Sequence, residues 1–483
     1  MKEGFFLEYQ VAIIGAGVVG AMAARELSRY RLKICLLEAE NDVAMGASKA
    51  NSGIIHAGYD PEPGTLKARF NREGNPLLYE AARQLRVPHR NNGAFVCAFS
   101  PEEEGQLEAL YRRGQENQIP GLSLLTGEEA RALEPGLSPM VTRVLLAATS
   151  GIICPYELTI AAVGNAMDNG VALYRNFRVS EIQKKETGFV LRSSRGESVQ
   201  AQWIVNCAGV HAGEIGRLAG DPLPQILPRA GEYVLLDKNQ GTLVSCTIFQ
   251  VPTKAGKGIL VTPTVDGNLL VGPTAQRVPD GDCTGTTRQG LETVKTLGRK
   301  SVPGVDYRQV IAAFAGIRAS TPGKDFLLGQ AVPGLFHAAA IDSPGLSCCV
   351  ALGRYIAENL PLPKEENPDF NPIRENPHFF RELSLEEKND YIRLHPEYGK
   401  IVCRCEGVSL GEIRAACLVN PRPLDMDGIK RRTRAMMGRC QGGFCTPNIL
   451  TTLAKELGIA PEEVTKAGGA SRLLEKGGSY GKA

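Results

Sequence analysis

The sequence predicts an α/β protein in three parts: a Rossmann-like nucleotide-binding domain, an antiparallel β-sheet domain inserted into it, and a small, mainly helical C-terminal domain. Three observations support this prediction. The chain opens with a strand, a glycine-rich turn, a helix and a second strand. Its middle alternates between apolar and polar residues in short runs, and its end holds two pairs of closely spaced cysteines. A chain of 483 residues is long enough for two or three domains.

The composition is that of an ordinary globular protein and argues against several classes of function. A net charge of +3 is too small to indicate nucleic acid or an anionic membrane as a partner. No run of about 18 apolar residues predicts a transmembrane segment, and the acidic residues near the start do not fit a secretory signal. The 13 cysteines, an odd number, indicate reduced thiols, so we expect a cytoplasmic protein.

The opening stretch "VAIIGAGVVG" places Gly15, Gly17 and Gly20 in the spacing G-x-G-x-x-G. In a strand–turn–helix unit the first glycine permits the turn, the second lets the backbone approach a pyrophosphate, and the third packs the helix on the sheet. Glu38 closes the second strand, 21 residues after Gly17, where an acid hydrogen-bonds the adenosine ribose. These features predict a dinucleotide site, with the phosphates at the helix N-terminus.

The segment "GASKANSGIIHAGYD", residues 46–60, indicates which dinucleotide is bound. It resembles the FAD-dependent amino-acid oxidase superfamily, and within it the branch of glycerol-3-phosphate and L-2-hydroxyglutarate dehydrogenases and oxidases. The resemblance implies FAD as cofactor, contacts to it from Ser48 and Ser52, and a catalytic role for His56 at the reactive edge of the flavin. The alternative for His56 is a buried histidine that hydrogen-bonds the backbone.

The middle of the chain changes character. Runs such as "EYVLLD" and "NLLVGPT" alternate with period two between Gly, Asn and Asp turns, which predicts an antiparallel sheet. In the superfamily such a sheet is the substrate domain, laid over the isoalloxazine ring. The resemblance also implies that the turn at Gly209 returns the chain to the cofactor. His211 either lines the site or simply begins the next helix.

Candidate substrate residues come from three stretches. The stretch "FAGIRAS" holds Arg318, which by the resemblance binds the anionic group of the substrate; the alternative is an arginine paired with an acid at a strand end. Arginine matches carboxylate or phosphate with two parallel hydrogen bonds. The stretch "TKAGKGIL" holds Lys254 and Lys257, and a cation at Lys257 would suit a phosphate, although most lysines are simply solvated.

The third stretch, "PRAGEYVLLD", is similar to an Arg-Gly-Glu-Tyr strand of the family's substrate pocket. It supplies Arg229, Glu232 and Tyr233. Ala230 departs from the family pattern and leaves the register of Arg229 open.

A strand, a glycine turn and a long helix follow in "GLFHAAAIDSPGLSCCVALG". The resemblance implies that Gly345, Leu346 and Ser347 bring backbone N–H groups and a helix N-terminus to the pyrimidine end of the flavin. The positive end of the helix would stabilise the anionic reduced ring. We expect the neighbouring Cys348 and Cys349 to be core residues.

The proline-rich stretch "LPLPKEENPDFNPIRENPH" has the composition of a linker. It separates a catalytic module from a second unit. The expected boundaries are FAD-binding residues 1–90, 145–225 and 312–362, substrate-domain residues 91–144 and 226–311, a linker at 363–399, and a C-terminal domain at 400–483.

The C-terminal cysteines form a C-x-C pair and a C-x4-C pair, 34 residues apart: Cys403, Cys405, Cys440 and Cys445. Four thiolates in two pairs can hold zinc or an iron–sulfur cluster. C-x-C is tight for zinc, and the glycines of "GRCQGGFC" let N–H groups turn towards the sulfurs. The stretch "RTRAMMGRCQGGFC" resembles the bacterioferritin-associated-ferredoxin-like [2Fe–2S] domain, which implies a [2Fe–2S] cluster. Unligated thiols are a further alternative.

A basic cluster from Lys430 to Arg434 lies between the two cysteine pairs. No nucleic-acid recognition fold accompanies it. We therefore interpret it as a solvated helix face or as a docking surface for an acidic redox partner.

The two resemblances together predict a dehydrogenase. FAD would take a hydride from a secondary alcohol while His56 accepts the hydroxyl proton, and the [2Fe–2S] centre would carry the electrons out, one at a time. The expected partner is a flavin- or quinone-linked redox subunit in a hetero-oligomer, which could hold the protein at a membrane. The substrate we expect is sn-glycerol-3-phosphate; the alternatives are L-2-hydroxyglutarate or another 2-hydroxy acid, and a secondary amine such as proline. A different class stays open, a metal-sensing or nucleic-acid-binding module on an inactive flavoprotein.

Overall fold

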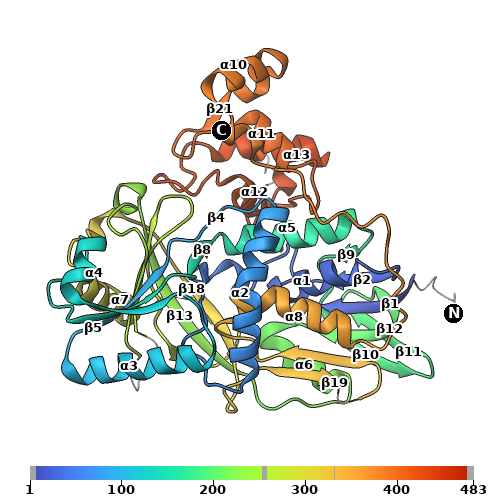
Figure 1. Cartoon of the computed structure of the whole chain (residues 1–483). Helices are drawn as coiled ribbons and strands as arrows, with labels where there is room; N and C mark the ends of the chain where they lie inside the picture. The colour runs from blue at the N-terminus through green and yellow to red at the C-terminus, as the bar shows by residue number, and fades with distance from the viewer. Residues whose placement is uncertain (1–6, 253–257, 331, 476–483) are drawn as a thin grey trace.

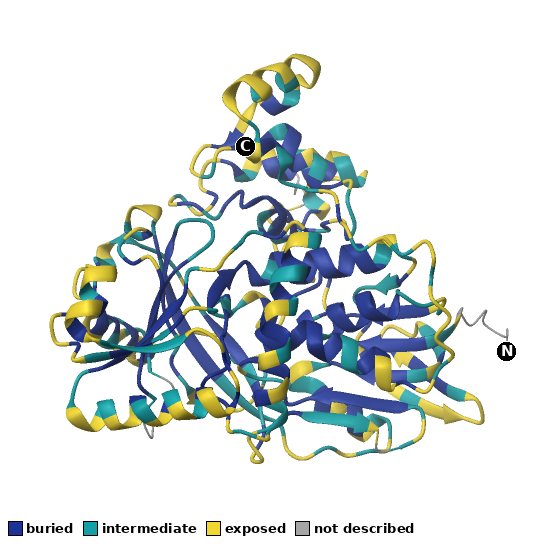
Figure 2. Cartoon of the chain, viewed as in Figure 1, coloured by how far each residue is buried: buried dark blue, intermediate teal, exposed yellow. Residues whose placement is uncertain are grey.

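The structure, a computed structural model, describes residues 7–252, 258–330 and 332–475. Two β-sheets stand side by side, and a smaller C-terminal domain, orange to red in Figure 1, lies across the place where they meet. Buried residues fill the strands of both sheets and the helices between them (Figure 2). Within the described ranges no helix is both long and apolar enough to cross a bilayer.

The first sheet has eight strands in the described chain, in the order β10-β11-β12-β1-β2-β9, with β20 beside β12 and β19 beside β20. The strands from β20 through β12, β1 and β2 to β9 are parallel, as a Rossmann-like domain requires. Their bounds are β1 Leu7–Ile14, β2 Ile34–Leu37, β9 Ala172–Tyr174, β10 Val179–Lys185, β11 Gly188–Ser193, β12 Ser198–Asn206, β19 Leu327–Gln330 and β20 Leu335–Ala339.

Helices cover both faces of this sheet because alternate residues of a strand point to opposite sides. Val11 and Ile13 of β1 pack with α1, α2, α5 and α8, whereas Ile14 packs on the side of α6. The bounds of these helices are α1 Val18–Leu27, α2 Leu66–Gln84, α5 Pro155–Asp168, α6 Ala212–Leu218 and α8 Gly345–Asn359.

The second sheet has nine strands in the described chain, in the order β17-β13-β16-β15-β14-β5-β7-β6, with β18 paired to β13. It is antiparallel except for the pair β5–β14, which confirms the predicted sheet. Helices α3, α4 and α7 flank it. The bounds are β5 Ala94–Ala98, α3 Pro101–Glu116, β6 Leu122–Thr126, α4 Gly127–Leu133, β7 Arg143–Ala147, β13 Leu227–Leu236, β14 Thr247–Gln250, β15 Leu260–Pro263, β16 Leu269–Gly272, β17 Gln276–Arg277, α7 Arg288–Ser301 and β18 Val310–Ser320.

Two boundaries of the second sheet lie later in the chain than expected. Strand β7 continues to Ala147, beyond the expected boundary at residue 144. Strand β18 belongs to this sheet up to Ser320, beyond residue 311, because it pairs with β13 along its whole length. A small three-stranded sheet joins the two large ones; its strands are β3 Ile54–Ile55, β4 His89–Arg90 and β8 Gly151–Ile153.

The C-terminal domain is small and mainly helical, as predicted. It starts before residue 400, because part of the expected linker folds onto it. The rings of Phe380 and Tyr398 lie 4.8 Å apart, and a Cβ atom at Gly411 would meet the Tyr398 ring at 2.2 Å. The bounds are α9 Phe379–Glu382, α10 Leu385–Leu394, β21 Ile401–Cys403, β22 Val408–Ser409, α11 Leu410–Ala416, α12 Met426–Thr433 and α13 Thr446–Leu457.

The remaining linker, residues 361–378, runs along the first domain. The N–H of Arg31 donates to the carbonyl oxygen of Glu365 at 2.8 Å, and the N–H of Asn367 donates to that of Arg29 at 2.7 Å. These backbone hydrogen bonds hold the proline-rich stretch against the first domain, so it is not a flexible linker.

The basic cluster of residues 430–434 does not form a solvated face or a docking surface for a partner. Arg431 and Arg432 are 6% and 7% exposed and hold Asp42, which is 0% exposed. Arg432 donates to both oxygens of Asp42 at 2.8 Å, and Arg431 donates at 2.6 Å. Burial opposes ionisation of Asp42, but the two guanidinium groups outweigh it and hold its pKa well below the usual range.

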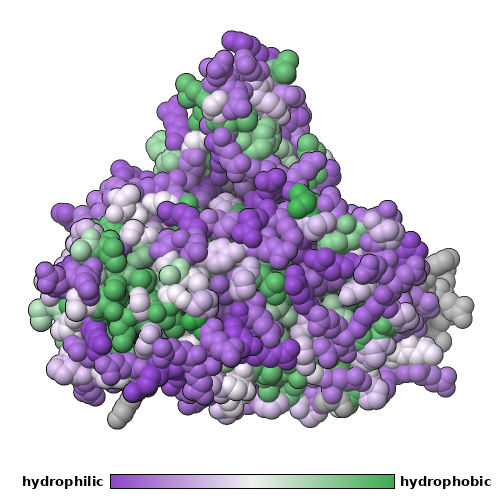
Figure 3. Space-filling view, viewed as in Figure 1, coloured by the Kyte–Doolittle hydropathy of each residue, from purple (hydrophilic) through white to green (hydrophobic). Residues whose placement is uncertain are grey.

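Arg434 makes the corresponding contacts to the second sheet. It is 6% exposed and pairs with Asp266, in the turn between β15 and β16, at 2.5 Å. It also pairs with Glu406 of its own domain at 3.0 Å. The C-terminal domain is therefore fastened to both sheets by buried arginines, and the surface along this seam is hydrophilic (Figure 3).

Replacing Asp42 by Asn should release this domain. Two buried arginines would lose their counter-charge, which costs about 3–5 kcal/mol. Urea unfolding and limited proteolysis at residues 361–378 measure the loss. The matched control is Glu365→Gln, which removes the exposed partner of Arg31 and should cost about 1 kcal/mol or less. Because the pKa of Asp42 is depressed in the fold, its contribution is present above the unfolded pKa of about 4 and is lost as the pH falls below it. Equal stability of Asp42→Asn and wild type would contradict this account.

Candidate functional site

The glycine turn between β1 and α1 closes as the G-x-G-x-x-G spacing predicts. Gly15 has a φ of +101°, and a Cβ atom there would lie 2.6 Å from the carbonyl oxygen of Cys207. A Cβ atom at Gly20 would lie 2.0 Å from the carbonyl oxygen of Gly15. Gly17 is the N-cap of α1. A side chain at the first or third position would push the helix off the strand, so the turn requires glycine.

Polar groups gather at the N-terminus of α1. Ser48 Oγ accepts a hydrogen bond of 2.9 Å from the N–H of Val18, and the Glu38 carboxylate accepts one of 2.8 Å from the N–H of Ala16. Burial raises the pKa of Glu38 to about 7. An open glycine turn, a helix N-terminus and a strand-end acid in one place fit the pyrophosphate and ribose of a dinucleotide.

His56 follows β3 and is 7% exposed. Its Nδ1 lies 3.1 Å from Asn71 Oδ1 and 3.0 Å from the backbone nitrogen of Gly58. The ring also packs beside Tyr59, with centroids 4.6 Å apart. These contacts hold the imidazole in one orientation.

Sequence reasoning missed the asparagines that hold this segment. Asn71 and Asn75 both donate to the carbonyl oxygen of His56, at 2.8 and 3.2 Å. They lie one turn apart on the buried face of α2. Two asparagines at positions i and i+4 on the apolar face of an amphipathic helix were the signal that could have identified them.

The N-terminus of α8 lies against the same segment. Ser347 Oγ accepts from the N–H of His56 at 2.7 Å and donates to the carbonyl oxygen of Ile54 at 3.3 Å. Gly345 and Leu346 precede it in the first turn of the helix, and a Cβ atom at Gly345 would lie 2.7 Å from Ile341. The structure thus brings the predicted residues Ser347 and His56 into contact.

One face of the β13–β18 ladder is turned towards the loop that carries Ser52. Ser52 Oγ lies 3.3 Å from the hydroxyl of Tyr233, and Tyr233 stacks on Phe314 with centroids 5.0 Å apart. A Cβ atom at Gly316 would lie 1.8 Å from the carbonyl oxygen of Ala50. The second sheet therefore closes tightly over the predicted cofactor loop.

Arg229 and Arg318 are directly opposite each other on this ladder. Arg318 Nη1 donates to the carbonyl oxygen of Thr274 at 3.3 Å, and Arg229 Nη2 donates to that of Ala275 at 3.5 Å. Arg229 Nε is buried without a partner. In the described part of the chain neither guanidinium forms an ion pair with a carboxylate. Two unneutralised like charges on neighbouring strands favour an anion between them.

The register therefore places Arg229 beside Arg318 despite Ala230. Glu232 points to the other face, where its carboxylate accepts from the N–H and hydroxyl of Thr287 at 2.8 and 3.0 Å, so it holds the start of α7. Lys254 and Lys257 lie outside the described residues. Gly209 has a φ of +58°, and the side chain of His211 is 38% exposed and lies 3.8 Å from Glu214.

The four cysteines predicted as ligands gather in the C-terminal domain. The side chains of Cys405 and Cys440 are neighbours, and so are those of Cys403 and Cys445. Cys403 and Cys445 are buried, whereas Cys405 is exposed. Among the described His, Cys, Asp and Glu side chains no three converge to hold a single metal ion. Two thiol pairs suit a two-iron cluster better than one zinc ion.

The backbone around Cys440 affects the pKa of its thiol. Burial favours the neutral thiol of Cys440, but hydrogen bonds from Cys405 and from the N–H groups of Phe444, Gly442 and Gly443 outweigh it and lower the pKa of Cys440. Gly442 has a φ of +92°. Backbone donors aimed at sulfur stabilise ligating thiolates, so the donor set fits a [2Fe–2S] cluster.

Comparisons with known proteins support both an FAD-binding module and a cluster-binding domain in this chain. Residues 10–359 match the family described as FAD dependent oxidoreductase, and residues 401–455 match the BFD-like [2Fe-2S] binding domain. A glycerol 3-phosphate dehydrogenase of Caloramator mitchellensis is 43% identical over 471 residues, which cover 96% of this chain and 98% of that protein. A glycerol 3-phosphate oxidase of Mycoplasma genitalium is 32% identical and covers 75% of this chain and 97% of its own length. The solved FAD-bound L-alpha-glycerophosphate oxidase of Mycoplasma pneumoniae has a TM-score of 0.73 at 32% identity, and the match covers 76% of this chain and 98% of that one.

These matches confirm the predicted α/β fold, FAD and the [2Fe–2S] cluster, whereas the roles of the individual site residues stay predictions. The chain belongs to the FAD-dependent oxidoreductase family and carries a BFD-like [2Fe–2S] binding domain at its C-terminal end.

Proposed function

We propose that this enzyme oxidises the secondary alcohol of sn-glycerol 3-phosphate to dihydroxyacetone phosphate and passes the electrons through its [2Fe–2S] domain to a separate acceptor. The observation that carries the proposal is the pair Arg229 and Arg318, two guanidinium groups without an ion-pair partner in the described residues, on the sheet face that closes over the cofactor loop. A phosphate dianion matches two arginines in charge and geometry. The full-length similarity to the Caloramator mitchellensis dehydrogenase supports this substrate.

His56 is the group proposed to accept the hydroxyl proton. In the tautomer whose Nδ1–H donates to Asn71 Oδ1, the lone pair lies on Nε2, so Nε2 is the atom that receives the proton. The hydrogen bonds of the His56 backbone to Ser347, Asn71 and Asn75 fix the position of the backbone that carries the ring. A general base held in this way keeps its distance to a bound alcohol.

The remaining residues orient the substrate. Bound FAD supplies the acceptor for the hydride of the carbinol carbon. Arg318 and Arg229 would hold the phosphate, with the predicted Lys257 as a third cation, and the stacked Tyr233 and Phe314 would shield the reacting end from water. Gly15, Gly17, Gly20, Glu38 and Ser48 would hold the dinucleotide.

The second domain favours a dehydrogenase over an oxidase. The Mycoplasma oxidases match their own full length but only three quarters of this chain, whereas the Caloramator mitchellensis dehydrogenase matches 96% of it. The unmatched quarter is about the size of the part beyond residue 360. An enzyme that reduces oxygen directly has no need of a one-electron carrier, so a retained cluster domain points to another acceptor.

The acceptor would meet the cluster at its exposed edge. Cys405 is exposed, and Phe444, next to Cys445, is 86% exposed. A large apolar side chain in water beside a redox centre is typical of a transient docking surface. We propose a flavin- or quinone-linked subunit as the partner, in a hetero-oligomer that works in the cytoplasm or on the inner surface of a membrane.

A 2-hydroxy acid is the second candidate, because an arginine pair also suits carboxylates. The mitochondrial L-2-hydroxyglutarate dehydrogenase of Mus musculus is 29% identical and covers 71% of this chain and 87% of its own length. Anaerobic bleaching of the flavin by each compound tests both proposals, and no bleaching by glycerol 3-phosphate would refute the first.

Replacing His56 by Asn should slow flavin reduction by about 10²–10⁴-fold, because the general base is lost, while substrate affinity changes little. Anaerobic stopped-flow at 450 nm measures both quantities. His395→Asn, in an exposed histidine of the C-terminal domain, is the matched control and should behave as wild type. A normal rate in His56→Asn would rule the residue out as the base.

Replacing Arg318 by Met should raise KM for glycerol 3-phosphate by about 10- to 150-fold, the value of one lost charge-assisted hydrogen bond. The exposed Arg308, which pairs with Asp306, supplies the control Arg308→Met. Oxidation of the uncharged propane-1,2-diol should be nearly equal in both variants. If KM for the phosphate ester were unchanged in Arg318→Met, the anion would bind elsewhere.

Replacing Cys440 by Ser should remove the visible absorption of the cluster and the turnover with one-electron acceptors, yet leave substrate-driven flavin bleaching intact. Cys417→Ser is the matched control: its buried thiol donates to the carbonyl oxygen of Ile413 and a hydroxyl can do the same. Iron analysis and anaerobic spectra of both variants check this. A full cluster in Cys440→Ser would show that the ligand set is different.

A further inference from the structure

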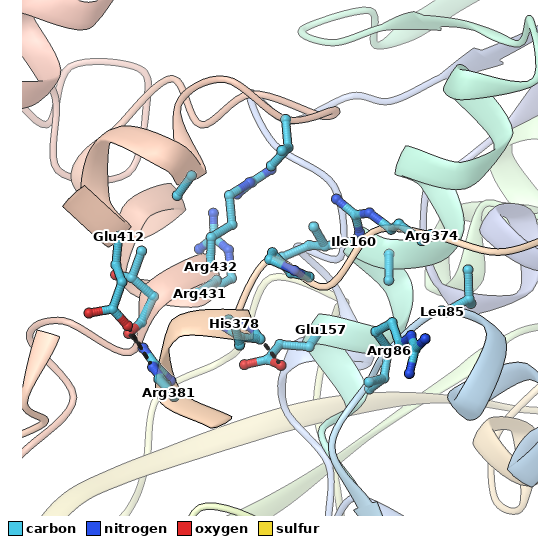
Figure 4. Close-up of a pocket in the computed structure, with 16 residues that line it drawn as sticks. Leu85, Arg86, Glu157, Ile160, Arg374, His378, Arg381, Glu412, Arg431 and Arg432 are labelled. Atoms are coloured by element: carbon cyan, nitrogen blue, oxygen red, sulfur yellow. Dashed lines mark hydrogen bonds and ion pairs between the residues drawn. The ribbon is translucent and has the colours of Figure 1, made fainter. Parts of the chain in front are cut away.

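A cavity of about 30 Å³ lies between the FAD-binding module and the C-terminal domain (Figure 4). Its walls come from α5, from the end of the linker and from α11 and α12. Space of roughly 10–15 Å³ holds one water molecule, so this cavity admits a compact ion of several atoms. The residues of the flavin site and the four cysteines do not line it.

Three buried arginines dominate the lining: Arg374, Arg431 and Arg432 are 8%, 6% and 7% exposed. Arg374 donates to the carbonyl oxygen of Asn420 at 2.6 Å and Arg432 to that of Pro421 at 2.9 Å. Because these carbonyls are consecutive, the two guanidinium groups lie near each other. Arg374 forms no ion pair within the described ranges, and Arg431 and Arg432 share the single carboxylate of Asp42.

Each of the two carboxylates on the wall already has a side-chain partner. Glu157 lies 3.3 Å from His378, and Glu412 lies 3.0 Å from Arg381 (Figure 4). Asp168 and Glu157 act on the buried positive charge of Arg374 from a distance, but no described carboxylate forms an ion pair with it. In addition, Arg431 Nε is buried and has no hydrogen-bond partner.

A buried charge that no ion pair neutralises is costly, and a buried N–H without an acceptor adds to that cost. A tetrahedral oxyanion removes both costs, since its oxygens accept from several arginines at once. We propose that this cavity is an anion site that binds phosphate, either free inorganic phosphate or the phosphate group of a small ester. The anion joins Arg374 of the linker to Arg431 of α12 and so fastens the [2Fe–2S] domain onto the module. This proposal does not depend on the identity of the substrate.

Hydrogen–deuterium exchange of the loaded full-length protein tests it, because the readout is local to residues 372–382 and 426–434. Inorganic phosphate at ten times its Kd should slow exchange in these peptides about tenfold, whereas sodium chloride at equal ionic strength should not. Glycerol 2-phosphate is the ester probe. Protection by inorganic phosphate supports free phosphate as the ligand, and protection by the ester alone supports an ester. Protection by neither overturns the proposal.

Two variants locate the effect. Arg374→Gln should abolish the protection, and the matched control Arg86→Gln, in an exposed arginine at the rim, should retain it. Arg431→Lys provides an independent test: it keeps a cation for Asp42 but removes the Nε donor, so phosphate protection should weaken. Flavin and cluster absorption verify that each variant is folded. Unchanged protection in both Arg374→Gln and Arg431→Lys would refute the site.

Discussion

The arrangement of the whole molecule depends on one buried interaction, the contact of Asp42 with Arg431 and Arg432. Asp42 lies four residues after Glu38, the acid that closes the second strand of the nucleotide-binding unit. The strand end that is predicted to hold the dinucleotide also anchors the cluster domain. Because the carboxylate is fully buried and shared by two arginines, the domain has one docked position. Arg434 extends the contact to the second sheet, so the cluster domain bridges both halves of the catalytic module.

A second constraint is the close approach of the two sheets. Gly316 and Gly231 are paired on the β13–β18 ladder, and side chains at these positions would meet the Ala50 carbonyl oxygen and the Arg318 guanidinium. Glycine at both positions lets the second sheet lie directly on the cofactor loop. The ladder then presents aromatic rings at one end and guanidinium groups at the other. That order suits a small substrate with a reacting end that must stay dry and a charged end that must be held.

The two redox sites differ in exposure, as their tasks require. His56 is buried and held by Asn71, Asn75 and Ser347, which suits hydride and proton transfer away from water. The cysteine site has Cys405 and Phe444 at the surface, which suits transfer to another protein. With these proposed roles, one chain combines a buried two-electron site with an exposed one-electron site, and the linker that packs on the first domain holds the two together.

The sequence by itself determined the features that short stretches of backbone impose. The glycine turn, the strand-end Glu38 and the spacing of the four cysteines are local, since each depends on what the neighbouring residues allow the chain to do. Tertiary structure decided the rest: the burial of the basic cluster, the pairing of Arg229 with Arg318, and the asparagines around His56. Asp42 and Arg432 are 390 residues apart in sequence, and nothing local to either identifies the partner. A run of charged residues looks the same in the sequence whether water solvates it or a distant carboxylate pairs with it. Only the fold could therefore distinguish a solvated helix face from a buried contact between domains.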